Sequence, residues 1–325
     1  MKKIFIGIDI SSRTLDICLK VDGEVEYFSI QNEVKAIRSF FKKYTATGTV
    51  VAMENTGRYN WNLFEVLGGM NLSVYVLSPL HLKKSLGLSR GKNDKIDSFR
   101  ICSYIEKNQA ETTPWCQSSL SIRRLKVLMA ERGTRIAMKS SLIRQQHDHG
   151  MMKSIGLDKE LLKLNKKLVE SINVQLKRIE TAIEKCIMDD AQLSDKVSLI
   201  RSVPGVGKVV SWMIIAKTEG FTSIQDPRKM ACYCGVVPFD HQSGTSIKYR
   251  PRVSVFADKG MKSLLHLAAM SSIRLNNDLG KYYKRKVEEG KNKMSVLNAV
   301  RNKIIHRIFA VIKNQTMYKN DLVLS

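Results

Sequence analysis

The sequence lacks the features that place a chain in a membrane. No uninterrupted apolar run among its 325 residues approaches the ~18 residues that a membrane-spanning helix needs. The start, Met1-Lys2-Lys3 followed by a short apolar run, resembles a signal peptide, but Asp9 interrupts the run and no small-residue cleavage site follows. We therefore read the start as a strand and expect a soluble, cytoplasmic protein with no membrane partner.

Signals for soft-metal binding and for nucleotide binding are also missing. The six cysteines contain no CxxC pair, and the six histidines form no HExxH motif. The segment Gly87–Asn93 resembles an ATP-binding loop, but it has one residue too few between its glycines and Asn after its Lys. These absences predict free thiols in a reducing compartment, no zinc site and no ATP-driven chemistry.

Acidic residues are scarce relative to basic ones. The chain has 30 Asp and Glu against 54 Lys and Arg, a formal net charge of +24. The excess is uneven, because residues 197–325 alone carry +14, against +4 for residues 1–115 and +6 for residues 116–196. A basic excess concentrated in one region favours a polyanion, since each neutralised phosphate releases condensed counterions. We expect nucleic acid to be the partner.

Residues 1–115 predict an α/β domain. Hydrophobic patterning predicts a strand over 3–10, two alternating strands over 13–20 and 24–30 joined by an Asp22-Gly23 turn, and a buried strand over 49–54. Helices are expected near 33–44, 60–68, 80–87 and 95–106, and a further strand at 72–77. A three-strand meander followed by alternating helix and strand matches the ribonuclease H-like (RuvC-like) arrangement.

The rest of the chain predicts a mainly helical protein. Within the segment 116–196, residues 119–195 contain no proline, and leucines and isoleucines recur every three to four residues. This pattern predicts an antiparallel coiled-coil arm folded back near 150–156. Residues 197–325 form the third predicted domain. It contains a helix-hairpin-helix-like segment around Pro204-Gly205-Val206-Gly207-Lys208, a basic loop over 239–259 and helices over 260–313.

Four acidic residues form the candidate site of the first domain. Asp9 ends the first strand and Glu54 ends the strand over 49–54, so both should lie at one edge of the sheet. Asp94 and Asp97 are three residues apart, which places them on one face of a helix. Four convergent carboxylates supply the hard oxygen ligands that Mg²⁺ prefers, and paired ions assist phosphoryl transfer.

Each acid also has an ordinary structural interpretation. Asp9 would serve as a turn former and Glu54 as a surface acid. Asp94 and Asp97 would stand at the N-cap and N3 positions of a helix. The order of strand end, strand end and helix pair within a basic chain favours the metal site over this alternative.

Motifs along most of the chain resemble one family. The motifs are Gly7-Ile8-Asp9, Glu54-Asn55-Thr56-Gly57-Arg58-Tyr59, Lys92-Asn93-Asp94-Lys95-Ile96-Asp97, Pro204-Gly205-Val206-Gly207, Gly235-Val236-Val237-Pro238 and Ser243-Gly244. In this order they resemble insertion-sequence transposases with an Asp-Glu-Asp-Asp RuvC-like domain and a C-terminal serine domain, described as bridge-RNA-guided recombinases. Two positions depart from that pattern: Ser98 stands where Ala is usual, and Leu265 where Arg is frequent.

The resemblance implies a function and an assembly. It assigns metal binding to Asp9, Glu54, Asp94 and Asp97, and the role of nucleophile to Ser243, which would form a phosphoserine with DNA with Mg²⁺ assistance. It also implies donor and target DNA, a noncoding bridge RNA, and dimers that join into a tetramer in the bacterial nucleoid. Within one active site, the carboxylates of one protomer would meet the serine of another.

Several basic residues are candidate phosphate contacts. Lys208 follows the glycine turn, and the other three lie near Ser243 in sequence: Lys248, Arg250 and Arg252. Their ordinary interpretation is a solvated basic surface.

Two alternative functions remain open. The first is a RuvC-like structure-specific nuclease that uses metal-activated water, with Ser243 uninvolved. The second is a non-catalytic nucleic-acid-binding protein whose acids are capping residues.

Overall fold

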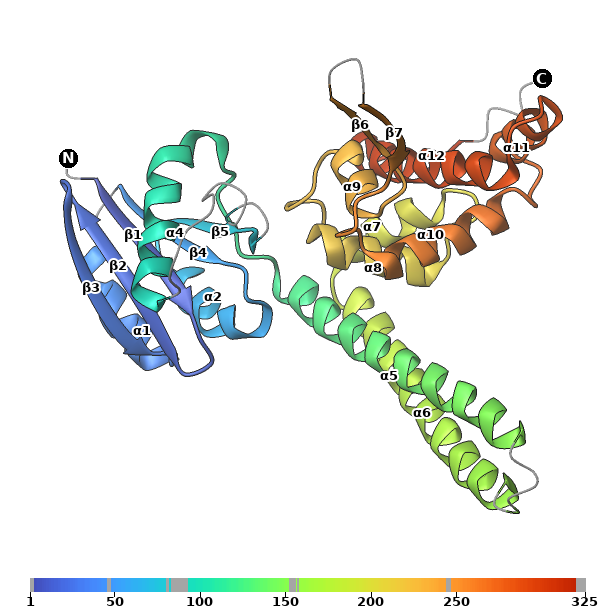
Figure 1. Cartoon of the computed structure of the whole chain (residues 1–325), viewed down its shortest axis with the longest axis horizontal. Coiled ribbons are helices and arrows are strands. Elements are labelled where there is room, and N and C mark those ends of the chain that lie inside the picture. The colour runs from blue at the N-terminus through green and yellow to red at the C-terminus, as the bar shows by residue number, and fades with distance from the viewer. Residues whose placement is uncertain are drawn as a thin grey trace. The chain divides into compact units, whose positions relative to one another are not determined.

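The computed structural model describes residues 3–45, 48–79, 82, 93–151, 156, 158–243 and 247–319. The chain divides into two compact units, Met1–Gln117 and Ser118–Ser325 (Figure 1). The arm expected over 116–196 lies within the second unit. The separation of 1–115, 116–196 and 197–325 into three domains stays a prediction.

The first unit is a five-stranded mixed sheet in the order β3-β2-β1-β4-β5. Its strands are β1 (Ile4–Ile10), β2 (Thr14–Val21), β3 (Glu24–Gln31), β4 (Thr49–Glu54) and β5 (Ser73–Leu77). β1 pairs antiparallel with β2 and parallel with β4, and β4 pairs parallel with β5. The predicted meander followed by parallel strands is confirmed, and the topology is consistent with a ribonuclease H-like fold.

Helices cover both faces of this sheet. One face packs against α1 (Val34–Phe41) and α2 (Trp61–Leu67), and the other against α4 (Asp94–Asn108). Because both faces are covered, β1 and β4 are almost wholly apolar, as expected for central strands. The hairpin turn at Asp22 and Gly23 adopts positive φ at both residues, as the Asp-Gly pair predicted.

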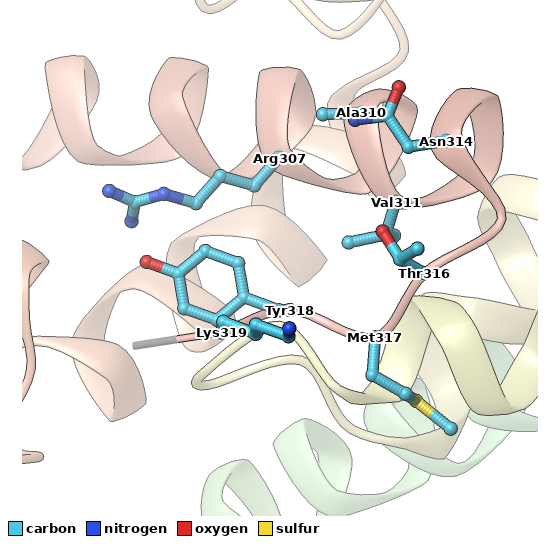
Figure 2. Close-up of a pocket in the computed structure, with 8 residues that line it drawn as sticks. All are labelled: Arg307, Ala310, Val311, Asn314, Thr316, Met317, Tyr318 and Lys319. Carbon is cyan, nitrogen blue, oxygen red and sulfur yellow. The ribbon is translucent and has the colours of Figure 1, made fainter. Parts of the chain in front are cut away.

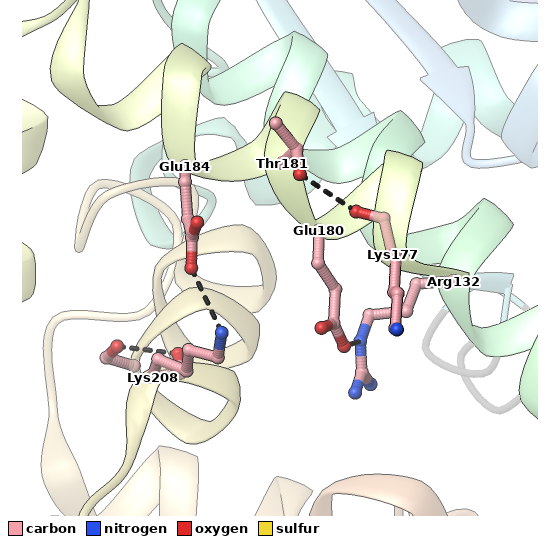
Figure 3. A network of polar contacts seen from close by, with 7 residues as sticks. Arg132, Lys177, Glu180, Thr181, Glu184 and Lys208 are labelled. Atoms are coloured by element: carbon pink, nitrogen blue, oxygen red, sulfur yellow. Dashed lines mark hydrogen bonds and ion pairs between the residues drawn. The ribbon is translucent and has the colours of Figure 1, made fainter. Parts of the chain in front are cut away.

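The arm consists of two long helices, α5 (Leu120–Met151) and α6 (Asp158–Met188), which pack along each other (Figure 1). Arg132 of α5 donates to Glu180 of α6 at 2.9 Å (Figure 3). Asn165 is buried between the helices and donates to Gln145 at 3.3 Å. Two leucines predicted to lie in the seam, Leu164 and Leu168, are instead 53% and 52% exposed, because they lie on another face of α6.

The remainder of the second unit is mainly helical, as expected. Its helices are α7 (Ala191–Arg201), α8 (Lys208–Thr218), α9 (Pro227–Tyr233), α10 (Lys259–Ser272), α11 (Asp278–Glu288) and α12 (Lys293–Asn314). They surround one core that contains Trp212 and Leu265. The loop predicted over 239–259 is partly wrong, since β6 (Phe239–Ser243) and β7 (Ile247–Arg252) form an antiparallel hairpin.

Some predictions fall outside the described residues. These are most of the helix expected near 80–87, the glycine-rich segment up to Lys92, the fold-back over 152–155 and Gly244. Within the described ranges, no helix combines the length and the apolar character needed to cross a bilayer. All six cysteines are free thiols, and Cys18, Cys102 and Cys234 are buried.

Candidate functional site

The pairing of β1 with β4 brings two of the predicted acids to one edge of the sheet. The parallel register aligns Gly7 with Ala52 and Ile8 with Met53. Asp9 and Glu54 are the next residues on their strands, so both lie at the carboxyl end of the parallel pair. The two strand-end acids are therefore neighbours, as the sequence predicted.

Both acids also face the helix that carries the other two. Side chains alternate along a strand, and the positions on the α4 face are occupied by Phe5 on β1 and by Val50 and Ala52 on β4. Asp9 and Glu54 continue these two series in steps of two. They therefore project from the face covered by α4, whose first turn contains Asp94 and Asp97.

Gly7 explains how closely α4 approaches. A Cβ at this position would lie 2.3 Å from the backbone oxygen of Ser98 and 2.4 Å from the backbone nitrogen of Cys102. Only glycine permits this contact, which lies two residues before Asp9. Ser98 is fully buried at the contact, and its hydroxyl donates to the Lys95 carbonyl at 3.0 Å. A serine in place of the more usual alanine is therefore accommodated.

The capping interpretation of Asp94 and Asp97 is wrong. The N-cap of α4 is Asn93, whose side chain accepts from the Lys95 amide at 3.1 Å. Asp94 and Asp97 both lie inside the first turn, where a carboxylate is favoured by the helix dipole. Asp94 is exposed and Asp97 is half-buried, where it accepts from Arg100 at 2.9 Å.

Asp9 responds to the charges of the other three acids. The pKa of Asp9 is raised to about 6 by burial first, and then by the negative charges of Asp97, Asp94 and Glu54. Among the described residues, however, no three His, Cys, Asp or Glu side chains are close enough in their present positions to hold a metal. The acids thus share one edge without forming a closed ligand set. As donors they are all hard oxygens, which fits a divalent cation such as Mg²⁺.

A fifth carboxylate lies beside this edge. Asp16 of β2 stands directly across from Asp9 in the antiparallel pair, so it lies on the same sheet face. Asp16 was not among the acids predicted from the sequence. The alternation of apolar and polar residues over 13–20 could have indicated its position, because this alternation determines which sheet face each residue of the strand occupies.

The turn after β4 is held by side chains. The side chain of Asn60, which is fully buried, donates to the Glu54 carbonyl at 3.0 Å and accepts from the Thr56 amide at 2.8 Å. The guanidinium of Arg58 lies 5.0 Å from the centre of the Tyr59 ring and donates to its hydroxyl at 3.0 Å. These contacts hold the turn that follows Glu54 at the acidic edge.

In the second unit, Ser243 is the last residue of β6 and pairs with Ile247 of β7. The described structure gives the backbone of this hairpin, and Lys248 and Arg250 lie on β7. Arg252, at the end of β7, is exposed. The predicted nucleophile and three basic residues therefore belong to one hairpin.

The segment that follows this hairpin is held by polar contacts of Asp258. Lys217 of α8 pairs with Asp258 at 2.7 Å, and the hydroxyl of Tyr233 also donates to Asp258, at 3.1 Å. The salt bridge and hydrogen bonds lower the pKa of Asp258 although burial opposes them. Asp258 also caps α10 through the Met261 amide at 2.8 Å, which fixes the chain that follows β7.

Lys208 begins α8 directly after the glycine turn. Its Nζ lies 3.0 Å from Glu184 on α6, and both side chains are 47% exposed (Figure 3). Gly205 adopts positive φ and packs so tightly on α10 that a Cβ would lie 2.4 Å from the Ala268 oxygen. The turn thus has a clear packing role. Leu265, where the resembled family often has Arg, is fully buried and offers no phosphate contact.

A pocket of about 320 Å³ lies near the end of α12 and is lined by Arg307 and Tyr318, among others (Figure 2). Arg307 pairs with Asp278, and its guanidinium lies 5.3 Å from the centre of the Tyr318 ring. The charge of Arg307 is therefore satisfied within the unit.

Comparison with known proteins assigns the segments that contain both sites to transposase families. A family model described as Transposase IS116/IS110/IS902 family matches residues 197–284, and a model of the DEDD domain of IS110 elements, described as Transposase, matches residues 6–151. The four carboxylates lie in the second match and Ser243 in the first.

The chain is also similar to curated proteins. The pilin gene-inverting protein of Moraxella bovis is 26% identical over 329 residues, covering 96% of this chain and 97% of that protein. The protein of the same name from Moraxella lacunata is 25% identical over 328 residues, with the same coverage. The insertion element IS110 uncharacterized 43.6 kDa protein of Streptomyces coelicolor is 26% identical over 126 residues, which cover 38% of this chain and 30% of that protein.

Proposed function

Because the chain belongs to the IS110 family of transposases, which break and rejoin DNA, we propose that Ser243 is its nucleophile and that Asp9, Glu54, Asp94 and Asp97 hold the metal. The observation that carries this proposal is the shared edge of the four carboxylates. The β1–β4 register and the contact at Gly7 bring together acids that lie up to 88 positions apart in the sequence.

A DEDD transposase domain implies a divalent metal, and we propose Mg²⁺. Bound Mg²⁺ would supply positive charge that stabilises the oxygens of the phosphodiester during transfer. The residues that would hold it are all carboxylates. Burial first, and then the negative charges of the other three acids, raise the pKa of Asp9, and a bound cation would oppose both effects. Arg100, which already bonds Asp97, would keep that carboxylate oriented.

The proposed reaction exchanges one phosphate ester bond for another. The Ser243 oxygen attacks the phosphorus of a phosphodiester, its proton passes to a base, and one DNA hydroxyl leaves. The product is a phosphoserine ester on one strand end and a free hydroxyl on the other. Attack by a hydroxyl on the phosphoserine reverses the step and rejoins DNA, so no nucleotide is consumed. Lys208, Lys248, Arg250 and Arg252 are the proposed contacts to neighbouring phosphates.

The experiment is a search for the covalent product. The protein, its noncoding RNA and a nicked DNA labelled on one strand are incubated with Mg²⁺, and protein–DNA adducts are separated under denaturing conditions. We expect an adduct that needs Mg²⁺ and disappears in Ser243→Ala and in Asp9→Asn. Ser254→Ala, a change of another serine after the hairpin, is the matched control and should keep the adduct.

The two alternatives give different products. A nuclease that uses metal-activated water would give hydrolysed ends without an adduct, and Ser243→Ala would remain active. A non-catalytic binding protein would retain DNA without any Mg²⁺-dependent cleavage. An adduct that persists in Ser243→Ala would assign the nucleophile to another residue.

The proposed function also involves an RNA partner and an oligomer. The Moraxella relatives are named for inverting a pilin gene, and inversion is one possible result of breaking and rejoining two sites. We propose that a noncoding bridge RNA selects donor and target DNA, and that dimers join into a tetramer through the arm. Exposed apolar residues on both arm helices, Ile136 and Ile143 on α5 and Leu164 and Leu168 on α6, support such a contact.

A further inference from the structure

Arg301, in the middle of α12, is a buried cation without an acidic partner. Its exposed fraction is 6%, and among the described residues no Asp or Glu forms an ion pair with it. It lies outside both segments matched by the transposase family models. Burial lowers the pKa of Arg301.

The neighbours of its guanidinium are neutral. Nη2 lies 2.6 Å from Nδ1 of His266 on α10, and Nη1 donates to Oδ1 of Asn298 at 3.2 Å. Nε is buried and has no hydrogen-bond partner. Because guanidinium nitrogens only donate, His266 accepts at Nδ1, which leaves its proton on Nε2 as a further donor. Both residues therefore offer N–H groups and no acceptor.

Arg307 on the same helix shows the usual arrangement. It lies six residues after Arg301, forms an ion pair with Asp278 and lies against the Tyr318 ring (Figure 2). Buried charges are normally paired in this way, since an uncompensated one is unfavourable. Arg301 has no such counter-charge among the side chains that the structure describes, and this difference from Arg307 needs an explanation.

The position of Arg301 suggests the source of that charge. Asn298, which accepts from Arg301, donates through Nδ2 to the carbonyl of Val236 at 2.6 Å. Val236 belongs to the Gly-Val-Val-Pro turn that leads directly into β6, the strand that ends at Ser243. The unpaired cation is thus linked by two hydrogen bonds to the origin of the serine strand. His266 on α10 is half-buried, so it is the member of the pair that reaches the surface.

We propose that Arg301 and His266 form an anion-binding site that takes a phosphate group of the DNA strand attacked by Ser243. This inference rests on the proposed function. The planar fork of an arginine matches two phosphate oxygens. The Nε2–H of the half-buried His266 is a second donor, on the side of the pair that reaches the surface. A phosphate would supply the negative charge that the described part of the unit lacks there.

The competing explanation is a structural one, in which Arg301 only ties α10, α12 and the turn together through hydrogen bonds. The two explanations differ in the effect of Arg301→Met, which removes the charge and keeps most of the volume. Removing a buried charge removes its desolvation cost, and we expect this gain to offset the loss of the hydrogen bonds to His266 and Asn298. Loss of a structural tie would instead lower the melting temperature.

The test uses the full chain and inorganic phosphate as the probe. Melting temperatures are measured with increasing sodium phosphate against sodium chloride at equal ionic strength, and adduct formation is timed on nicked DNA. The control is Arg285→Met, which removes the same charge from an exposed position on α11. For Arg301→Met we expect an unchanged or higher melting temperature without phosphate, no phosphate-dependent rise, and adduct formation slower by about 10- to 100-fold.

The outcomes separate this inference from the proposed function. If phosphate raises the melting temperature of Arg301→Met as much as that of Arg285→Met, Arg301 has a structural role and the anion site is overturned. If Arg301→Met does not fold, Arg301→Lys decides, because it keeps the charge but loses the fork, and an undiminished phosphate response would contradict the proposal. If Ser243→Ala still forms an adduct, the assignment of the nucleophile fails, while the phosphate response still reports on Arg301.

Discussion

Asp9 is the acid of the site whose pKa is clearly shifted. Its pKa of about 6 lies above the ordinary value of 3.8, so the folded state favours the protonated form. The corresponding stability is present below pH 4 and is lost as the pH rises through 6. At neutral pH, the ionised Asp9 therefore lowers the free energy of unfolding of the first unit. A role in metal binding would explain why an acid stands at this position.

The substitution Asp9→Asn tests this directly. We expect its free energy of unfolding at pH 7.5 to exceed that of the wild type by about 1–2 kcal/mol, after allowance for solvent screening. The difference should shrink towards pH 4, and Mg²⁺ should stabilise the wild type but not the variant. Denaturant unfolding at several pH values measures both effects. A variant less stable than the wild type at pH 7.5 would contradict the interpretation.

Gly7 gives a second prediction at the residue scale. Gly7→Ala places a methyl group where the Ser98 oxygen and the Cys102 nitrogen leave no space, so α4 must move away from β1. We expect a loss of stability of about 2–3 kcal/mol or more and loss of Mg²⁺-dependent adduct formation. Gly133→Ala in α5, where nothing lies within 4 Å of the added methyl, is the matched control. It should be neutral or stabilising by up to ~1 kcal/mol.

Helix α4 is the element that completes the acidic edge. Its first turn depends on Asn93, the cap that the capping interpretation had overlooked. Asn93→Ala should cost about 1 kcal/mol of stability and loosen the turn that carries Asp94 and Asp97. We therefore expect weaker Mg²⁺ binding, measured by titration calorimetry, whereas Asn93→Asp keeps the cap and should retain affinity. Equal affinity in Asn93→Ala and the wild type would show that the cap does not position the acids.

Strands and helices differed in how well the sequence predicted them. The buried strands at Ile4–Ile10 and Thr49–Glu54 and the long arm helices have strong apolar periodicity, and their positions were predicted within a few residues. The β6–β7 hairpin was not predicted, because β6 is mainly polar and the apolar–basic alternation of β7 is short and runs into Pro251. The exposure of Leu164 was also missed, since spacing alone does not say which face of a helix meets a partner.

At the scale of the assembly, the proposed sharing of active sites between protomers can be tested by mixing inactive variants. In a mixed dimer of Asp9→Asn and Ser243→Ala, a shared arrangement gives one site with both residues intact and one with both altered. We therefore expect the mixture to regain adduct formation that neither variant shows alone. If each protomer uses its own acids and serine, every site in the mixture is defective and no activity returns.

The charge of the whole chain predicts how it binds nucleic acid. With a net charge of +24, affinity for DNA should fall steeply as salt rises, because binding releases counterions in proportion to the phosphates contacted. Replacing one phosphate-binding lysine or arginine should reduce the slope of log affinity against log salt by about 1. Fluorescence anisotropy over a salt series compares Arg252→Ala with the wild type. An unchanged slope would remove Arg252 from the proposed contacts.

The sequence by itself determined the class of the protein. Its charge indicated nucleic acid, its strand pattern indicated the sheet, and the order of its motifs indicated the family. It also named the four acids, because strand ends and helical spacing are local properties. Only the tertiary structure decided how the acids share an edge, since that depends on the β1–β4 register and on the close contact at Gly7. Arg301 was likewise beyond sequence reasoning, because an arginine inside a helix reveals neither its burial nor its neighbours until the helices pack.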